Sequence, residues 1–447
     1  MTTVAMPKGP RLPVLGALVG PGRNPLWLFS RFARDYGDVT FFKLGGEHCY
    51  LLNHPQVIRD VLVTHQNNFT KSRGLERAKK LLGEGLLTSE APVHLRQRRL
   101  LQPAFHRDRI AGYAQVMSDN AARMRQRWQD GAAFDVSKEM MRVTLAIVGK
   151  TLFDTDVESD ADEVGGAVTD VLESFWLNLL PGADFLEKLP IPKLRRAQAA
   201  RRRLDRLIYT MIADRRASGR DHGDLLSTLV AAQDEEGTGG LSDEQVRDEA
   251  MTLLLAGHET TANALSWTWY LLSQNREAEA RLHEELDRVI GGRVAVMADM
   301  PNLPYTERVI TESMRLYPPA WVVGRRAIAD CTIGEYNVPA RSILFMSPFV
   351  MQRDARFFAE PLCFSPERWT PEFKAALPKF AYFPFGGGAR QCIGEHFAWM
   401  ELLLVLASAA QRWRLRLVPN HPVVPQPLIT LRAKHGIKMT AHARRMQ

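Results

Sequence analysis

The feature that most constrains this chain is an aromatic, glycine-rich stretch that leads through one cysteine into a strongly apolar helix. The stretch reads FPFGGGARQCIGEHFAWMELLLVLASAAQRW and covers residues 383–413. Free backbone N–H groups and the positive end of the helix dipole favour a thiolate at Cys392, at the predicted helix start. The glycines let the backbone approach a flat ligand closely. The segment therefore predicts a permanently ionised sulfur ligand.

The cysteine count supports a special role for Cys392. The other three cysteines are Cys49, Cys331 and Cys363, and no two of the four form a C-x-x-C pair. This spacing argues against a zinc ribbon and fits a reducing compartment. The first 25 residues are rich in Pro and Gly, unlike a signal peptide or membrane span, so we expect a cytoplasmic protein.

A long helix is the second strong prediction. Ser242 and Gln245 form a capping box, and the helical pattern runs to about residue 274, or ~48 Å at 1.5 Å per residue. Polar and small residues at 257–261 (GHETT) interrupt its apolar run. Thr260 can bond back to the carbonyl of Ala256 and bend the helix there. The pattern predicts a functional cavity; the alternative is a helix beside a wet cavity without chemistry.

The remaining patterns predict a mainly α fold with small β-sheets. Residues 38–53 resemble two strands around a Gly45-Gly46 turn, and Trp413, Leu415 and Leu417 alternate with arginines near the C-terminus. The helical patterns on either side of the loops within 218–241 show no break in composition. We therefore expect a single domain over 1–447, preceded by no membrane anchor, with 1–25 as an N-terminal arm and no fused reductase.

Five residues around the cysteine resemble a known family. Phe385, Gly388, Arg390, Cys392 and Gly394 reproduce F-x-x-G-x-R-x-C-x-G, the haem-binding motif of the cytochromes P-450. A chance match in a chain of this length is on the order of one in ten thousand. The resemblance implies the cytochrome P-450 fold, with haem b between the long helix and the Cys392 loop and with the thiolate as the iron ligand.

Three further segments resemble the same family in the expected order. Residues 256–260 match A/G-G-x-D/E-T, which implies that Thr260 organises water and Glu259 leads to a proton supply. Glu312 and Arg315 match E-x-x-R, and Arg368 matches the arginine that completes a buried ion triad. The resemblance also nominates cofactor contacts: His94, Arg98, Ala256, Arg325, Phe385, Arg390 and Gly394. His94 could instead be a surface histidine, and Arg326 could replace Arg325.

The implied activity is oxygen insertion into a small hydrophobic substrate such as a fatty acid, terpenoid or steroid. Electrons would come from an acidic ferredoxin or flavodoxin with its NAD(P)H-dependent reductase, docked on the Cys392 side of a monomer. Two alternatives stay open: a haem-thiolate isomerase or peroxygenase, and a non-catalytic haem sensor.

Two other patterns are open to more than one interpretation. The net charge is +8, and many arginines lie within 192–216 beside a helical apolar stripe. This stripe favours a solvated helix face over a nucleic-acid patch. Apolar residues at 320–323 and around 81–87 resemble substrate-contacting regions of the family, although they could equally be core residues.

Overall fold

The computed structural model describes residues 6–10, 24–44, 46–155, 164–171, 174, 191–232 and 240–444. Its contacts form two compact units. Unit 1 comprises Met1–Arg77, Glu312–Cys392 and Ile429–Leu431, and unit 2 comprises Ala78–Thr311, Ile393–Leu428 and Arg432–Gln447. The single domain over 1–447 stays a prediction, and most of the predicted arm 1–25 lies outside the described residues.

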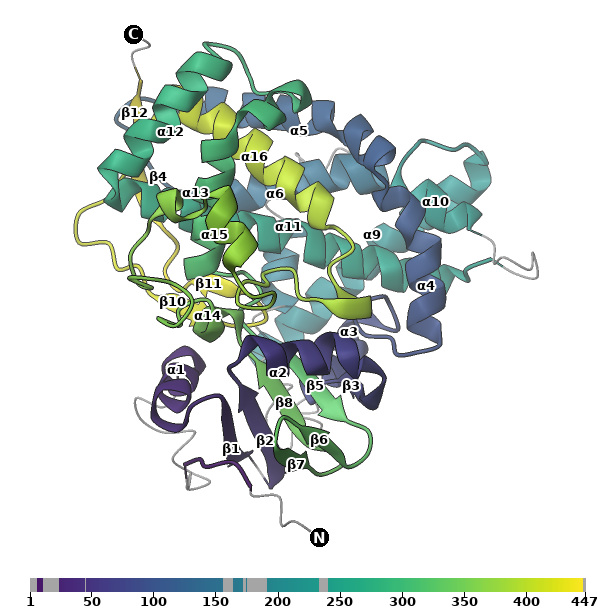
Figure 1. Cartoon of the computed structure of the whole chain (residues 1–447). Helices are drawn as coiled ribbons and strands as arrows, with labels where there is room; N and C mark the ends of the chain where they lie inside the picture. The colour runs from purple at the N-terminus through teal and green to yellow at the C-terminus, as the bar shows by residue number, and fades with distance from the viewer. Residues whose placement is uncertain are drawn as a thin grey trace. The chain divides into compact units, whose positions relative to one another are not determined.

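Unit 1 is built on a five-stranded sheet (Figure 1). Its strands, in spatial order, are β1 (Val39–Leu44), β2 (Glu47–Leu52), β8 (Ile343–Met346), β5 (Val323–Ala327) and β3 (Phe69–Lys71). Strands β1 and β2 pair antiparallel with Leu44 opposite Glu47, which confirms the predicted strand pair around Gly45-Gly46. Alternate residues of β2 and β8 point to opposite faces, so this sheet contributes to two apolar clusters.

Short elements complete unit 1. They are α1 (Pro25–Tyr36), α2 (Pro55–Arg59), η2 (Asp60–Thr64), η3 (Gln66–Asn68), β6 (Cys331–Ile333), β7 (Tyr336–Val338), α14 (Pro348–Met351), η6 (Pro366–Arg368), α15 (Pro371–Ala376) and η7 (Gly388–Arg390). Phe29 and Phe32 of α1 are buried, and Phe29 packs on Trp321 with ring centroids 6.2 Å apart. Trp321, one of the predicted substrate contacts, therefore belongs to this apolar cluster.

Unit 2 is mainly helical. It contains α4 (Val93–Leu101), η4 (Gln102–Phe105), α5 (Arg107–Arg127), α6 (Val136–Phe153), α9 (Pro192–Ser218), α10 (Leu225–Ala231), α11 (Asp243–Gln274), α12 (Arg276–Val289), η5 (Met297–Asn302) and α16 (Glu395–Arg412). Its strands are β4 (Ala133–Asp135), β9 (Trp413–Leu417), β10 (Pro425–Pro427) and β12 (Lys438–Ala443). Three elements are divided between the units: α3 (Arg73–Leu82), α13 (Pro304–Leu316) and β11 (Leu431–Ala433). The predicted fold class, mainly α with small sheets, is confirmed.

Helix α11 is the centre of unit 2, packed against α6 and α16 (Figure 1). Ser242 and Gln245 form the predicted capping box, and the helix runs for 32 residues to Gln274, as predicted. Gly257 has a packing role that the sequence did not reveal. A Cβ atom at this position would lie 3.1 Å from Val148 of α6, so glycine lets the two helices approach closely.

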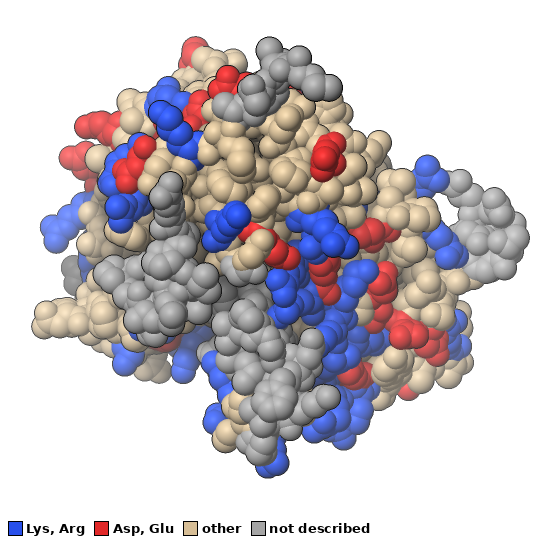
Figure 2. Space-filling model, turned by 90° about the horizontal axis from the view of Figure 1, so that it is seen from below, with Lys and Arg blue, Asp and Glu red and all other residues tan. Residues whose placement is uncertain are grey.

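The arginine-rich segment forms helix α9. Leu204, Ile208 and Ile212 are buried along one side, as the helical spacing predicts. Several of the arginines make ion pairs; Arg215 bonds to Asp224 at 2.5 Å, and Arg216 bonds to Asp243 at 2.6 Å. On the face of the molecule drawn in Figure 2, Lys and Arg side chains lie interspersed with Asp and Glu side chains. None of the helices in the described ranges has the length and apolar character needed to cross a bilayer.

Candidate functional site: the Cys392 loop and helix α11

The Cys392 loop is shaped by glycines in the left-handed region. Gly386 and Gly388 have φ values of 71° and 70°. A Cβ atom on Gly388 would lie 1.9 Å from the carbonyl oxygen of Leu62, so no larger residue fits there. The backbone N–H of Cys392 donates to the carbonyl of Phe385 at 3.0 Å. The loop is therefore a closed turn that presents an exposed, free cysteine.

The start of the following helix differs from the prediction. Helix α16 begins at Glu395 with Gly394 as its N-cap, so Cys392 lies three residues before the first helical residue. The two residues between them, 393 and 394, form a turn. The helix dipole therefore favours a thiolate at Cys392 less than expected, because its effect falls off within about one turn of the helix end.

A buried ion cluster supports the loop from within unit 1. Glu312 and Arg315 have no exposed side-chain surface. Glu312 accepts from Arg315 at 2.7 and 2.8 Å and from Arg368 at 3.0 Å, which confirms the predicted triad. The indole N–H of Trp369 adds a donor at 2.8 Å that the motif did not predict. Every lone pair of the carboxylate thus has a partner, which burial of a charge requires.

This cluster connects to the chain that precedes Cys392. The Trp369 ring packs on Tyr382 with centroids 4.8 Å apart. Buried Gln352 donates to the carbonyl of Arg315 and accepts from the N–H of Phe383 at 3.1 Å. The ion cluster therefore fixes residues 382–383, a few positions before the glycines of the Cys392 loop.

The choice between Arg325 and Arg326 is addressed by ion pairs in unit 1. Arg326 bonds to Glu76 at 3.2 Å and to Glu47 at 3.4 Å. Arg325 is 8% exposed, and its guanidinium donates to the carbonyl of Gly324. Two carboxylates already hold Arg326, which makes it a poor candidate for an anionic cofactor, and the contact by Arg325 stays a prediction. Arg390, in η7, is half-buried.

Helix α11 has one open strip. Leu253, Leu254 and Leu255 are buried, whereas Ala256 is exposed and Thr260, four residues later on the same side, is half-exposed. The Thr260 hydroxyl donates to the carbonyl of Ala256 at 2.8 Å, as predicted. The side of the helix that carries the alcohol is therefore lined by small side chains and is accessible.

Glu259 is held by a residue that sequence reasoning missed. Its carboxylate is buried and bonds to the guanidinium Nε of Arg432 at 2.5 Å. Arg432 lies in β11, 173 residues away in the chain. Neither residue stands in a local pattern that pairs them, so only the tertiary fold could reveal the contact. The ion pair holds the Glu259 carboxylate in place, one residue before Thr260 in the chain.

A second buried acid lies close to the same turn. Glu401 of α16 is fully buried, and neither carboxyl oxygen has a hydrogen-bond partner among the described residues. Burial raises its pKa well above the usual range, while the nearby Thr261 hydroxyl acts in the opposite direction. That hydroxyl donates to the carbonyl of Gly257 at 3.3 Å. Burial therefore favours the protonated form of Glu401.

Histidine contributes a neutral ring to this segment. His258 is buried, and its Nδ1 lies 2.9 Å from the carbonyl of Leu254. Burial lowers its pKa below the ordinary value, so the ring stays uncharged and Nδ1 carries the proton. On α4, His94 is 4% exposed and Arg98, one turn later, is half-buried. The alternative of His94 as a surface histidine is therefore wrong.

Comparisons with known proteins decide the family. The sequence profile of the family "Cytochrome P450" matches residues 6–439. The chain is 42% identical to cyclooctatin synthase of Streptomyces melanosporofaciens, covering 94% of this chain and 92% of that one. It is 34% identical to pentalenene oxygenase of Streptomyces avermitilis, covering 97% and 96%. The chain belongs to the cytochrome P-450 family.

A solved structure agrees with this membership. The structure resembles the crystal structure of the cytochrome P450DA heme domain with a TM-score of 0.88 and 26% identity, covering 99% of this chain and 98% of that one. A third relative, cyclooctat-9-en-7-ol 5-monooxygenase of Streptomyces melanosporofaciens, is 37% identical over 92% of this chain. This cytochrome P-450 is accordingly a haem-thiolate monooxygenase.

The residues present fit a haem group. Cys392 is an exposed thiol without a disulfide, on a turn whose glycines let the backbone lie close to Leu62 and Phe380. Arg325 and Arg390 in unit 1, and Arg98 in unit 2, are cations suited to propionates. A bound haem would supply oxygen activation through its iron. The chain itself would provide the sulfur ligand, the cations for the propionates and the proton-handling groups of α11.

Proposed function

We propose that this cytochrome P-450 oxidises a cyclic terpenoid, using haem b and electrons from a separate protein. The observation that carries the proposal is the 42% identity, over nearly the whole chain, to cyclooctatin synthase. Two further relatives are named for the oxidation of cyclooctat-9-en-7-ol and of pentalenene. A terpenoid is favoured over a fatty acid or steroid for this reason.

We assign the site residues as follows. Cys392 supplies the iron ligand, and Phe385 and Gly394 border it on the cysteine side. Arg98, His94, Arg325 and Arg390 bind the propionates, and Ala256 lies against the ring. Thr260 holds and orients water, and Glu259 passes protons to it while Arg432 holds that carboxyl group in place. The arrangement of an accessible alcohol beside a buried, paired acid supports this division of roles.

We propose that the electron donor is an acidic ferredoxin or flavodoxin with its NAD(P)H-dependent reductase. A hollow of about 430 Å³ in unit 1 is lined by α2 and by the chain near Lys379. Arg59 and Lys379 are exposed there. The adjoining η2 contacts η7 of the Cys392 loop. A basic rim beside the ligand loop fits an acidic donor. We place the protein in the cytoplasm as a monomer.

The test is turnover by the purified holoenzyme with a surrogate ferredoxin system. A cyclic terpene alcohol should shift the haem spin state and give a product that contains one additional oxygen atom. A linear fatty acid of equal carbon number is the matched comparison and should bind more weakly. Turnover of the fatty acid alone would contradict the terpenoid assignment.

The same assay separates the remaining alternatives. Product formed with peroxide but not with the electron donor would indicate a peroxygenase, and a rearranged product without added oxygen would indicate an isomerase. Binding without turnover of any terpenoid would favour a sensor.

The docking proposal has its own test. The double variant Arg59→Glu with Lys379→Glu should slow reduction of the protein severalfold at low salt and much less at high salt.

A further inference from the structure

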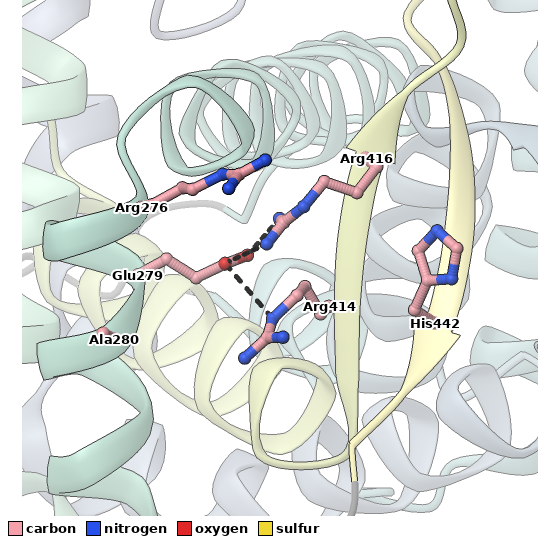
Figure 3. A pocket seen from close by; sticks show the side chains of 6 residues that line it. All are labelled: Arg276, Glu279, Ala280, Arg414, Arg416 and His442. Atoms are coloured by element: carbon pink, nitrogen blue, oxygen red, sulfur yellow. Dashed lines mark hydrogen bonds and ion pairs between the residues drawn. The ribbon is translucent and has the colours of Figure 1, made fainter.

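A basic pocket in unit 2 belongs to none of the groups assigned above. It has a volume of about 530 Å³ and lies between the first turn of α12 and strands β9 and β12 (Figure 3). Its lining consists of Arg276, Glu279, Ala280, Arg414, Arg416 and His442. Three guanidinium groups meet a single carboxylate, so the lining has an excess of two positive charges with His442 counted as neutral.

The carboxylate in the pocket already bonds to the two strand arginines. Glu279 is 3% exposed and receives two hydrogen bonds from Arg416, at 2.7 and 2.6 Å. The Nε of Arg414 lies 3.3 Å from the same carboxylate (Figure 3). The side chain of Arg414 is still 47% exposed. Glu279 therefore orders the two strand arginines but balances the charge of only one.

Arg276 supplies the unbalanced charge on the opposite wall. It is the first residue of α12, and its exposed side chain makes no hydrogen bond or ion pair within the described part of the chain. The N-cap Asn275 gives no side-chain cap, since its amide donates to the carbonyl of Leu271 instead. The positive end of the helix dipole thus adds to the charge of Arg276.

Buried His283 lies one turn beyond Glu279, close to the same arginines. It is 4% exposed, and neither ring nitrogen has a hydrogen-bond partner among the residues described. Burial lowers its pKa to about 3, and the charges of Arg444, Arg414 and Arg416 act in the same direction. Even with Glu279 in place, this corner of unit 2 repels a further proton.

We propose that the pocket binds a dianion of the phosphate class, as the free anion or as the phosphate group of an ester. Guanidinium groups reach the pocket from a helix on one side and a strand on the other. A tetrahedral anion with three acceptor oxygens can bond to the guanidinium groups on both sides. A planar carboxylate, in contrast, matches the paired N–H groups of only one guanidinium. The volume exceeds that of a phosphate ion and leaves room for an organic group on one oxygen.

The test is calorimetric binding of inorganic phosphate, pyrophosphate and glycerol phosphate to the holoenzyme at low salt. Arg276→Gln should weaken binding roughly tenfold, the loss of one charge-assisted contact. The matched control is Arg288→Gln, an exposed arginine on α12 that does not line the pocket. It should change the Kd less than about twofold. Equal losses in the two variants, or no saturable binding to the wild type, would overturn the proposal.

Two comparisons sharpen this result. Tighter binding of the ester than of the free ions assigns an organic phosphate, and the reverse order assigns an inorganic anion; either supports the site. Saturating anion should also shift the imidazole NMR signals of His283 at neutral pH, because the anion binds next to the arginines that surround this ring. Binding that leaves His283 unchanged would place the anion elsewhere and contradict the proposal.

Discussion

Two buried carboxyl groups, one in each unit, have opposite surroundings. Glu312 accepts hydrogen bonds from Arg315, Arg368 and Trp369 and from the backbone N–H of Ser365. Glu401 is equally buried, but neither of its oxygens has a hydrogen-bond partner in the described part of the chain. The carboxylate of Glu312 is surrounded by donors that replace water, whereas burial without donors raises the pKa of Glu401. Burial alone therefore does not decide what a carboxyl group does.

The largest effect should follow from breaking the saturated cluster. Arg315→Met leaves the carboxylate of Glu312 short of two donors in a site without solvent, which costs roughly 3–5 kcal/mol of folding free energy. Unfolding by denaturant, together with haem content, measures this loss. Arg315→Lys keeps the charge and should recover part of the stability. A variant as stable as wild type would contradict the structural role.

The next effect concerns the ion pair on α11. Glu259→Gln should lower product formation by about 100-fold, within the usual range for a proton-transfer group, with little change in substrate binding. Arg432→Gln should act in the same direction, and Arg432→Lys should restore most activity because it keeps a cation near the acid. Turnover measured against pH checks the assignment. Unchanged rates in Glu259→Gln would exclude the proton route.

Thr260→Ala should have a smaller effect on rate but a clear effect on yield. Its hydroxyl bonds only to its own helix carbonyl in the described contacts. The folding free energy should therefore change by less than about 1 kcal/mol. Product formed per NAD(P)H consumed should fall severalfold. Thr260→Ser, which keeps the hydroxyl, is the control, and wild-type coupling in Thr260→Ala would mean that the residue only packs.

The smallest effect is a pH dependence of stability from Glu401. Its raised pKa means that the folded chain holds a proton that the unfolded chain releases above the ordinary carboxyl pKa, so this group lowers stability as pH rises through that window. Glu401→Gln should remove this contribution to the pH dependence of stability. The stability of the variant relative to wild type should increase from pH 5 to pH 8 in denaturant titrations. A constant difference would mean that Glu401 is ionised.

Local patterns predicted the parts of the fold that local chemistry determines. The capping box at Ser242, the long helix and the Thr260 hydrogen bond all depend on neighbours within a few residues. The Glu312 triad was predicted by resemblance, since an i,i+3 pair alone could lie on any surface helix. Where local rules alone were applied, the start of α16 was placed three residues early.

Contacts between distant segments were not predictable. Arg432 joins Glu259 from 173 residues away, and the raised pKa of Glu401 comes from its burial in α16, which packs on α11. The sequence pattern attributed Gly257 to a cavity, yet the absence of a side chain there also lets Val148 of a neighbouring helix pack closely. Each of these depends on three-dimensional packing that one sequence, without aligned relatives, does not encode in any short pattern.

The most direct test of the account is the identity of the iron ligand. Dithionite-reduced protein under carbon monoxide should give a strongly red-shifted Soret band in the wild type, and Cys392→Ser should lose it. Cys363→Ser, at another exposed cysteine, is the control and should keep the band. A histidine-like band in the wild type, or an unchanged band in Cys392→Ser, would contradict thiolate ligation by Cys392.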